Sequence, residues 1–387
     1  MPPSTHPHDI VIIGGGVMGL SIAHALAAAG TRPLVLERRF LGAGSTGKSG
    51  AIIRQHYSLE LTATMARDSL RAYSRFEDEI GGGAGFVRCG MAIVIAARHR
   101  EGLRRNLEMQ RRLGIRTDEL DARQIRDAVP GAVTDDESVG CYEPDAGYAD
   151  PLRTLQSLAA AVRRLGGEIR EEVEVTGFVG ESRVTGVRTA GGVIEADHVV
   201  VAAGPWAARV MTWVGWKADI EAVRVQSAVL RRPLDFAAGP VVIDFQNEMY
   251  AKHAAETHVG SISASEVDPA DPDAYDETAD HAYLETAHDR VARRLPAMRR
   301  AVRHGGYGAL YAVTPDWHPL VGRAGPDGLY LCAGFSGHGF KLAPSIGKTV
   351  AAELLGETPP YDFGVLRPDR FAEQMPVVSQ YEYSILG

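Results

Sequence analysis

The sequence has little cysteine and lacks a long apolar run. Its three cysteines, Cys89, Cys141 and Cys332, are odd in number and far apart, which excludes a disulfide framework and a cysteine-based metal cluster. No run of eighteen or more apolar residues occurs, so we expect no transmembrane helix. Residues 1–9 are polar and proline-rich, without the apolar segment of a signal peptide. These absences predict a cytoplasmic protein without a metal site.

The sequence also lacks an excess of basic residues. Lysine and arginine number 41 against 49 aspartates and glutamates, for a net charge of −8. Nucleic-acid-binding proteins need a basic surface, so this balance argues against such a partner. A hydrophobic content of 45% over 387 residues is enough for one large domain or two intertwined ones.

Two glycine-rich segments lie within the first fifty residues, and each matches a phosphate-binding pattern. Residues 14–19 read GGGVMG, the G-x-G-x-x-G of dinucleotide-binding proteins. A strand is predicted before it at 9–13 and a helix after it at 17–29, and a second strand ends at Glu37. Backbone N–H groups of such a loop bind a pyrophosphate, and the acid accepts hydrogen bonds from both ribose hydroxyls. The same carboxylate would repel the 2′-phosphate of NADP.

The second segment, residues 42–49, reads GAGSTGKS and matches the P-loop of nucleoside triphosphatases. It follows the second strand instead of the first, and residues 50–54 are a poor helix start. The predicted strand 198–202 does not end in the acid that would hold Mg²⁺. We therefore interpret it as a second contact on the same cofactor, through Ser45, Thr46 and backbone N–H groups.

The rest of the chain alternates between helical and extended patterns. A glycine-rich break at 81–85 marks the first exit from the nucleotide-binding part. Asp150 is predicted to cap a helix that starts at Pro151 and ends before Gly166. Further helices are predicted at 59–79, 98–113, 118–128, 278–295 and 343–355, and strands at 172–178, 184–189, 198–202 and 329–333, with short strands within 221–263.

Three motifs in this order resemble the FAD-dependent amine and amino-acid oxidoreductases of the D-amino-acid oxidase superfamily, nearest the sarcosine oxidase and dimethylglycine dehydrogenase group. They are residues 44–54, GSTGKSGAIIR; residues 310–322, LYAVTPDWHPLVG; and residues 333–341, AGFSGHGFK. The resemblance spans residues 9 to about 360, with 216–304 weakly matched.

The resemblance implies a mixed α/β fold in which a Rossmann-like FAD-binding domain is interleaved with a mainly antiparallel-sheet substrate domain. The FAD-binding domain would comprise 1–85, 145–215 and 305–365, the substrate domain 86–144 and 216–304, and a C-terminal tail 366–387.

FAD is the cofactor that the resemblance implies. Residues 337–341 open a helix whose N–H groups and dipole would face the flavin N1 and C2 carbonyl. Ala309 and Lys48 stand where other members attach FAD through Cys or His, so we predict non-covalent FAD. The residues expected to contact it are Gly14, Gly16, Val17, Met18, Glu37, Arg38, Ser45, Thr46, Ser49, Gly50, Val175, Gly204, Trp206, Gly337, Gly339, Phe340 and Lys341.

Arg54 and Lys341 match the basic residues that clamp the substrate carboxylate in the sarcosine oxidase group. An arginine fork suits both carboxylate oxygens. The substrate would then be an amino acid or an N-methylated amino acid instead of a plain amine. Tyr311 stands where the D-amino-acid oxidase and glycine oxidase branch has an arginine, which makes the substrates of that branch less expected.

Four further residues, Tyr250, His258, Tyr311 and His338, are candidates for catalysis. In monomeric sarcosine oxidases, a lysine on a strand above the flavin assists the reaction with oxygen, and the best register places His258 there. The same register places Tyr250 at a substrate-facing tyrosine. A structural histidine and a packed aromatic ring remain equal alternatives for these two. His338, within the flavin segment, is either held by the backbone or catalytic.

The predicted reaction is oxidation of the C–N bond of a secondary or tertiary amino acid, N-methylated or cyclic, by hydride transfer to the flavin. The imine product then hydrolyses. Electrons pass to oxygen or to another acceptor, and the sequence leaves both a homo- and a hetero-oligomer open. One alternative is an electron-passing, β-like subunit of a larger flavoprotein, and another is a NAD-linked dehydrogenase that uses the first loop.

Overall fold

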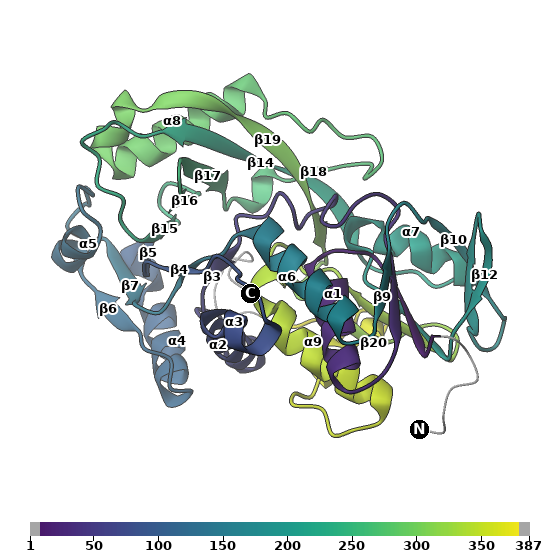
Figure 1. Cartoon of the computed structure of the whole chain (residues 1–387). Helices are drawn as coiled ribbons and strands as arrows, with labels where there is room; N and C mark the ends of the chain where they lie inside the picture. Colours follow the sequence, from purple (N-terminus) through teal and green to yellow (C-terminus); the bar gives the residue numbers. More distant parts are fainter. Residues whose placement is uncertain (1–7, 379–387) are drawn as a thin grey trace.

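The computed structural model describes residues 8–378 (Figure 1). Residues 1–7 and 379–387, which include most of the polar N-terminal segment and the end of the predicted tail, lie outside the described part. Within the described part, a six-stranded sheet is parallel except at β20. Its order is β20 (Leu320–Arg323), β21 (Leu329–Ala333), β13 (His198–Val201), β1 (Ile10–Ile13), β2 (Pro33–Leu36) and β9 (Glu168–Arg170).

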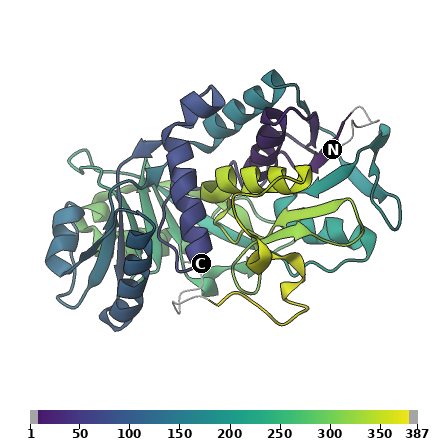
Figure 2. The ribbon, with the colours of Figure 1, turned by 90° about the horizontal axis from the view of Figure 1, so that it is seen from below.

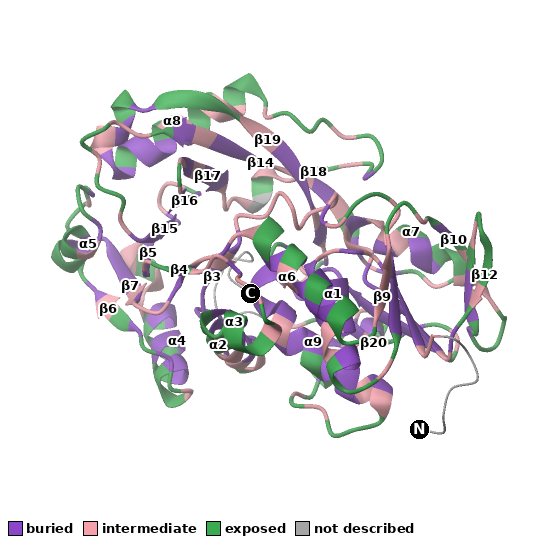
Figure 3. Cartoon of the chain, in the orientation of Figure 1, coloured by how far each residue is buried: buried purple, intermediate pink, exposed green. Residues whose placement is uncertain are grey.

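Alternate residues of β1 face two different layers, which is why this strand is apolar throughout. Ile10 and Ile12 pack under the helical layer, whereas Val11 and Ile13 pack against the opposite layer. The helical layer contains α1 (Val17–Ala28), α2 (Glu60–Ser74), α6 (Pro151–Arg164) and α9 (Gly339–Leu355). The opposite layer contains α7 (Ala207–Met211) and a small sheet of β10 (Val175–Val179), β11 (Gly186–Thr189) and β12 (Gly192–Glu195). The central strands are buried in Figure 3.

A second, mostly antiparallel sheet forms the other body of the molecule, at the upper left in Figure 1. Among the described residues it has nine strands, and the long β19 (Val302–Val313) pairs with β14. The remaining order is β18 (Asp268–Pro269), β14 (Glu221–Arg231), β17 (Thr257–Ser261), β16 (Met249–His253), β15 (Val241–Asp244), β5 (Met91–Ile95), β7 (Val139–Glu143) and β6 (Asp118–Leu120). The helices α4 (Arg100–Arg112), α5 (Ala122–Ala128) and α8 (His281–Arg294) pack on it.

A short sheet joins the two bodies. It consists of β3 (Ile52–Ile53), β8 (Gly147–Tyr148) and β4 (Val87–Arg88), and β3 leads directly into Arg54. Seen from below, α2 stands between the bodies and α9 packs against it (Figure 2). The close packing of α9 on α1 needs Gly347, since a Cβ there would lie 2.6 Å from the carbonyl oxygen of Ser21.

The predicted fold class is confirmed, and several element boundaries differ. The helix predicted over 59–79 is two helices, α2 and α3 (Phe76–Ile80), separated at Arg75. Residues 118–120, predicted as the start of a helix, form strand β6. The helix begins only after Asp121, because the capping box of Asp121 satisfies the first N–H groups of the residues that follow it. Helix α9 begins at Gly339, four residues before the predicted start. The Asp150 cap forms as predicted, with its Oδ1 accepting the Arg153 N–H at 2.9 Å.

Candidate functional site

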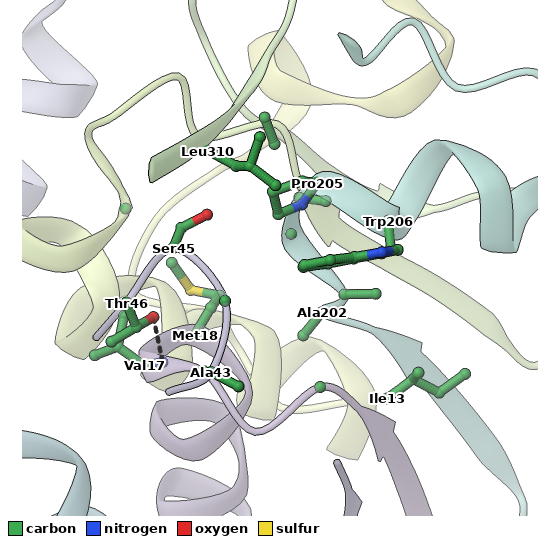
Figure 4. A pocket seen from close by; sticks show the side chains of 18 of the residues that line it. Ile13, Val17, Met18, Ala43, Ser45, Thr46, Ala202, Pro205, Trp206 and Leu310 are labelled. Carbon is green, nitrogen blue, oxygen red and sulfur yellow. Dashed lines mark hydrogen bonds between the residues drawn. The ribbon is translucent and has the colours of Figure 1, made fainter. Parts of the chain in front are cut away.

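A cavity of about 280 Å³ opens at the carboxyl ends of β1, β2, β13 and β21 (Figure 4). The carboxyl edge of a parallel sheet is where doubly wound folds bind ligands. Most residues that the sequence predicts as cofactor contacts line it. They are Gly14, Gly16, Val17, Met18, Glu37, Arg38, Ser45, Thr46, Ser49, Val175, Gly204, Trp206, Gly337, Gly339 and Phe340. In Figure 4, Trp206 lies across the cavity from Thr46 and Val17.

The first glycine loop forms a cradle for an anion. Gly14 has a φ of +115°, and a Cβ there would lie 2.5 Å from the carbonyl oxygen of Ala202. Gly16 caps α1 without a side chain, so the N–H groups of the first turn face the cavity. Thr46 Oγ1 accepts the Val17 N–H at 3.1 Å, which ties the second loop to the first. The buried Ser45 Oγ has no partner within residues 8–378 and is free for a ligand.

Glu37 lines the cavity and also accepts a hydrogen bond from the first glycine loop. Its Oε2 accepts the Gly15 N–H at 2.8 Å, and its Oε1 accepts the Arg39 N–H at 2.9 Å. A carboxylate has about four acceptor positions, so two remain for the predicted ribose hydroxyls. The ribose contact itself stays a prediction.

Lys48 does not act as a P-loop lysine. Its Nζ donates to Tyr275 Oη at 2.8 Å, to Glu277 Oε2 at 2.9 Å and to the Gly308 carbonyl at 3.0 Å. An ammonium has three protons, and all three are engaged. None is left for the terminal phosphates that a P-loop lysine contacts, so the GAGSTGKS match is incidental.

Residues 271–277 cross from the antiparallel body to the cofactor cavity, and we name this segment the strap. Asp273 lines the cavity and binds Arg38 at 2.7 Å, the Trp206 Nε1–H at 2.8 Å and Arg209. Arg38 also lies 4.3 Å from the centre of the Trp206 ring. Lys48 holds the other end of the strap. The strap therefore locks two predicted cofactor contacts in place.

A second cavity of about 110 Å³ adjoins the first, and the two share Lys48, Ser49, Ala309, Tyr311, Ser336, Gly337 and Phe340. It brings together Arg54, Lys341, His338, Tyr250 and Tyr311 from the predicted catalytic set. Gly50 and Lys341 line this second cavity and not the first, and their contact with the cofactor stays a prediction. Arg54 follows β3 and Lys341 lies in the first turn of α9, and these two elements pack against each other.

Arg54 and Lys341 are buried basic residues, and neither forms an ion pair within residues 8–378. The guanidinium of Arg54 lies 4.1 Å from the Tyr57 ring centre and donates to the His56 carbonyl. Lys341 Nζ has only a 3.4 Å contact with the Gly337 carbonyl. Burial, together with the charge of Arg54, holds the pKa of Lys341 well below its ordinary value. Buried charges without counter-ions are costly, so a bound anion would stabilise this pair.

His338 lies directly beside Arg54 and caps α9. Its Nδ1 is 3.4 Å from Arg54 NH2 and 3.2 Å from Tyr57 Oη, and its buried Nε2 has no partner in the described part of the chain. Burial, with Lys341 and Arg54 next, holds the pKa of His338 well below its ordinary value. The ring is therefore neutral, and a catalytic role stays a prediction.

His258 lines neither cavity, which corrects the prediction that it stands at the site. It lies opposite Lys252 in the ladder of β16 and β17, on the same face as Tyr250 but two residues farther along. Its ring packs edge-on against Tyr307, 6.4 Å between centres. The weak match over 216–304 placed the residue on the right strand face and at the wrong depth.

Glu143 is a fully buried acid close to the Arg54 charge. One carboxyl oxygen accepts the Gln55 N–H at 2.9 Å, and the other has no partner among residues 8–378. Burial raises the pKa of Glu143 to about 7, although the Gln55 N–H and Arg54 favour the charged form. A carboxyl group whose pKa rises on folding stabilises the fold fully below its unfolded value, here 4.5. That contribution is lost as pH rises through about 7.

We expect Glu143→Gln to flatten this dependence. Between pH 5 and 8 the free energy of unfolding of the unaltered protein should fall by about 1–3 kcal/mol relative to the variant. Urea unfolding across this range measures the difference. The exposed Glu181→Gln provides the matched control. Parallel pH profiles for Glu143→Gln and the unaltered protein would show that Glu143 is charged in the fold.

Sequence reasoning missed Trp317, Ser227 and Tyr307, which also line the second cavity. Trp317 has a φ of +61°, rare for a bulky residue, and it sits within the 310–322 motif that carried the resemblance. Ser227 and Tyr307 have no local signal, because they meet only through strand pairing.

No helix within residues 8–378 is long and apolar enough to span a membrane. No group of three or more metal-binding side chains capable of holding an ion gathers in that part of the chain either.

Comparison with known proteins gives one family. The family model described as "FAD dependent oxidoreductase" matches residues 9–353. The chain is 28% identical to 4-methylaminobutanoate oxidase (formaldehyde-forming) of Paenarthrobacter nicotinovorans, over 96% of this chain and 46% of that protein. It is 26% identical to peroxisomal sarcosine oxidase of Mus musculus, over 96% of this chain and 98% of that protein. It thus spans about half of the first relative and nearly all of the second.

Solved structures agree with this match. The crystal structure of L-proline dehydrogenase from P. horikoshii superposes with a TM-score of 0.89 at 28% identity, covering 96% of this chain and 100% of that one. Glycine oxidase from Geobacillus kaustophilus has a TM-score of 0.82 at 22% identity, covering 95% and 99%. The second likeness shows the fold alone.

Proposed function

Because the chain belongs to the FAD-dependent oxidoreductase family, we propose that it oxidises the C–N bond of a small secondary or tertiary amino acid, N-methylated or cyclic. The observation that carries this proposal is the pair of buried cations, Arg54 and Lys341, in a small cavity that adjoins the cofactor cavity. The names of similar proteins add support, since methylaminobutanoate, sarcosine and proline all combine a carboxylate with a secondary amine.

The first cavity fits FAD. The Gly14–Gly16 cradle and the open N-terminus of α1 suit its pyrophosphate, and the unpartnered Ser45 hydroxyl adds a donor. Bound FAD supplies the acceptor of a hydride equivalent. Gly337 and Gly339, at the start of α9, line the same cavity and place the positive end of that helix there.

The residues of the second cavity bind the substrate and select its protonation state. Arg54 can hold both carboxylate oxygens in its fork, and Lys341 adds a second cation. Two positive charges in one buried site disfavour a third, which here would be the protonated amine of the substrate. We therefore propose that they favour the neutral form of the substrate amine, whose nitrogen lone pair is needed to expel a hydride from the neighbouring carbon. Tyr250, Tyr311 and Trp317 also line the cavity, and we propose that these aromatic rings restrict the entry of water.

We propose that FAD is bound without a covalent link. Ala309, at one attachment position of other members, carries no nucleophile, and Lys48, at the other, is engaged by the strap and by Gly308. Acid precipitation of the holoenzyme should leave the flavin absorbance in the supernatant. Yellow colour retained in the pellet would contradict non-covalent binding.

The strap should control how tightly FAD is held. We expect Asp273→Asn to raise the Kd of FAD about 3- to 10-fold, because it removes the anion that holds Arg38, Trp206 and Arg209. Salt screens exposed ion pairs, so the Kd of the unaltered protein should rise with ionic strength more steeply than that of the variant. Flavin fluorescence titration of the apoprotein measures both the Kd of FAD and its salt dependence.

The control is Asp235→Asn, which breaks a surface pair with Arg300. Equal affinities and equal salt slopes would show that the strap does not hold the cofactor.

The reaction is tested by anaerobic mixing of the holoenzyme with sarcosine, N-methyl amino acids, proline and pipecolate. We expect loss of the oxidised flavin absorbance with at least one of them. Parallel assays with oxygen and with a dye acceptor then separate oxidase from dehydrogenase. Failure of every secondary and tertiary amino acid to reduce the flavin would overturn the proposal.

The remaining sequence-based statements stay proposals. We propose that the two sheets mark the FAD-binding domain (1–85, 145–215 and 305–365) and the substrate domain (86–144 and 216–304). An electron-passing subunit would not need the Arg54–Lys341 pair, and the FAD family replaces the NAD-linked alternative. The cytoplasmic location and the oligomeric state stay predictions.

A further inference from the structure

One wall of the second cavity is a row of residues from four neighbouring strands. Strand pairing sets Tyr307 of β19 opposite Ser227 of β14, Ser227 opposite Gly260 of β17, and Gly260 opposite Tyr250 of β16. Residues directly opposite in antiparallel strands point to the same face of a sheet. Two tyrosines therefore flank a serine and a glycine.

Gly260 lets one of these tyrosines lean inward. A Cβ at this position would lie 2.3 Å from Cε1 of Tyr250 and 2.5 Å from its hydroxyl oxygen. The ring of Tyr250 thus lies across β17, towards Ser227. Tyr250, Ser227 and Tyr307 all line the cavity, and we name these three residues the hydroxyl row.

The hydroxyl row has unmet hydrogen-bonding capacity. Ser227 is only 4% exposed, and its Oγ has no hydrogen-bond partner within residues 8–378. Burial raises the pKa of Tyr307, with a partial offset from the neighbouring Ser227 hydroxyl, so the Tyr307 hydroxyl stays protonated and can donate a hydrogen bond. A buried hydroxyl without a partner costs free energy, so a ligand atom that bonds to it contributes to affinity.

The charges around this wall are already neutralised. Lys48 is bound to Glu277 at 2.9 Å, and Glu266 is bound to Arg290 at 2.7 Å. A second substrate carboxylate placed here would lack a counter-ion, which is expensive in a buried site. A neutral group that both donates and accepts hydrogen bonds fits the wall without that cost.

We propose that the hydroxyl row is a subsite for a neutral hydrogen-bonding group, a hydroxyl in the first instance, carried by the substrate away from its carboxylate. The proposal rests on the amino-acid oxidation proposed above and narrows its substrate class. Cyclic amino acids with a ring hydroxyl are then preferred over the plain ring.

Binding of ring carboxylates that contain no nitrogen tests the subsite without turnover. The probes are cyclopentanecarboxylate and the cis and trans isomers of 3-hydroxycyclopentane-1-carboxylate, titrated into the holoenzyme and followed by the change in flavin absorbance. One hydroxylated isomer should bind about 5- to 10-fold more tightly than the plain acid. Ser227→Ala and Tyr307→Phe should each bring this ratio near one and leave the Kd of the plain acid within about twofold. Ser74→Ala, outside both cavities, should change neither.

The outcomes separate the two proposals. A ratio near one in the unaltered protein, or a ratio that survives both substitutions, overturns the subsite, as does the absence of binding by every probe. If the ratio of the two Kd values behaves as expected, the subsite is supported even if no amine reduces the flavin. In that case only the proposed oxidation reaction is wrong. With active enzyme, kcat/KM for 4-hydroxyproline and for proline should show the same preference and the same loss of it in Ser227→Ala.

Discussion

Replacing Arg54 with alanine should lower kcat/KM for every carboxylate substrate by about 10²- to 10³-fold. Truncating one partner of a buried, hydrogen-bonded charge pair costs about 2–5 kcal/mol. Arg54 is 4% exposed, has no acidic partner among residues 8–378, and lies with Lys341 on the wall of the second cavity. We therefore expect a substrate carboxylate to act as the counter-ion of Arg54.

The variant series distinguishes charge from shape. Arg54→Lys keeps the charge and loses the fork, so we expect an intermediate loss. Most of the effect should be in KM, because the carboxylate is bound equally in the ground state and the transition state. The Kd of a carboxylate that is not oxidised, followed by flavin absorbance, should weaken in parallel. Arg104→Ala, an exposed helix residue paired with Glu119, is the matched control. An Arg54→Ala enzyme that loads FAD and binds the carboxylate with unchanged Kd would disprove the clamp.

Replacing Arg370 with alanine should destabilise the fold by about 3–5 kcal/mol, since it breaks a buried ion pair. Arg370 is fully buried and binds both oxygens of Asp316, at 2.8 and 2.7 Å. It also donates to the carbonyls of Pro319 and His318 at 2.9 and 2.7 Å. The variant leaves the buried Asp316 carboxylate without its counter-ion and removes a donor from the Pro319 and His318 carbonyls.

Urea unfolding of the FAD-loaded protein measures this loss. The control is Arg367→Ala, three residues away, whose pair with Glu373 is partly exposed and should cost less than about 1 kcal/mol. Asp316 adjoins Trp317, which lines the second cavity, so Arg370→Ala should also raise KM. If Arg370→Ala unfolded within 1 kcal/mol of the unaltered protein, the ion pair would contribute no net stability. Arg370 lies within 366–387, the segment predicted as a C-terminal tail. Because Arg370 is fully buried, this segment packs into the fold at least as far as Arg370.

The cofactor half of the molecule could be predicted from local sequence. A β-branched run, three glycines, an alanine-rich segment and Glu37 follow one another within thirty residues, and each restricts the backbone of its neighbours. The GAGSTGKS segment matches the P-loop pattern, but the strand and helix that flank a P-loop are absent around it. The sequence alone therefore argued against a nucleoside triphosphatase. The structure adds that Lys48 is fully engaged, a fact that depends on Tyr275 and Glu277 far along the chain.

The substrate half was predicted less well, and His258 shows why. Alternation along a strand gives the face of the sheet but not the depth at which a residue meets a cavity, which depends on strand register. Ser227 and Tyr307 carry no motif, and the register of β14 and β19 alone makes them neighbours.

By itself, the sequence determined the family and the cofactor, and it indicated the two basic residues that we propose bind a carboxylate, since each lies in a short, ordered motif. Tertiary structure alone decided that Arg54 and His338, 284 positions apart, share one buried site, and that three hydroxyls line its wall. The physical reason is that local propensity acts over a few residues. The shape and charge of this cavity arise from strand pairing and from the packing of α9 against β3.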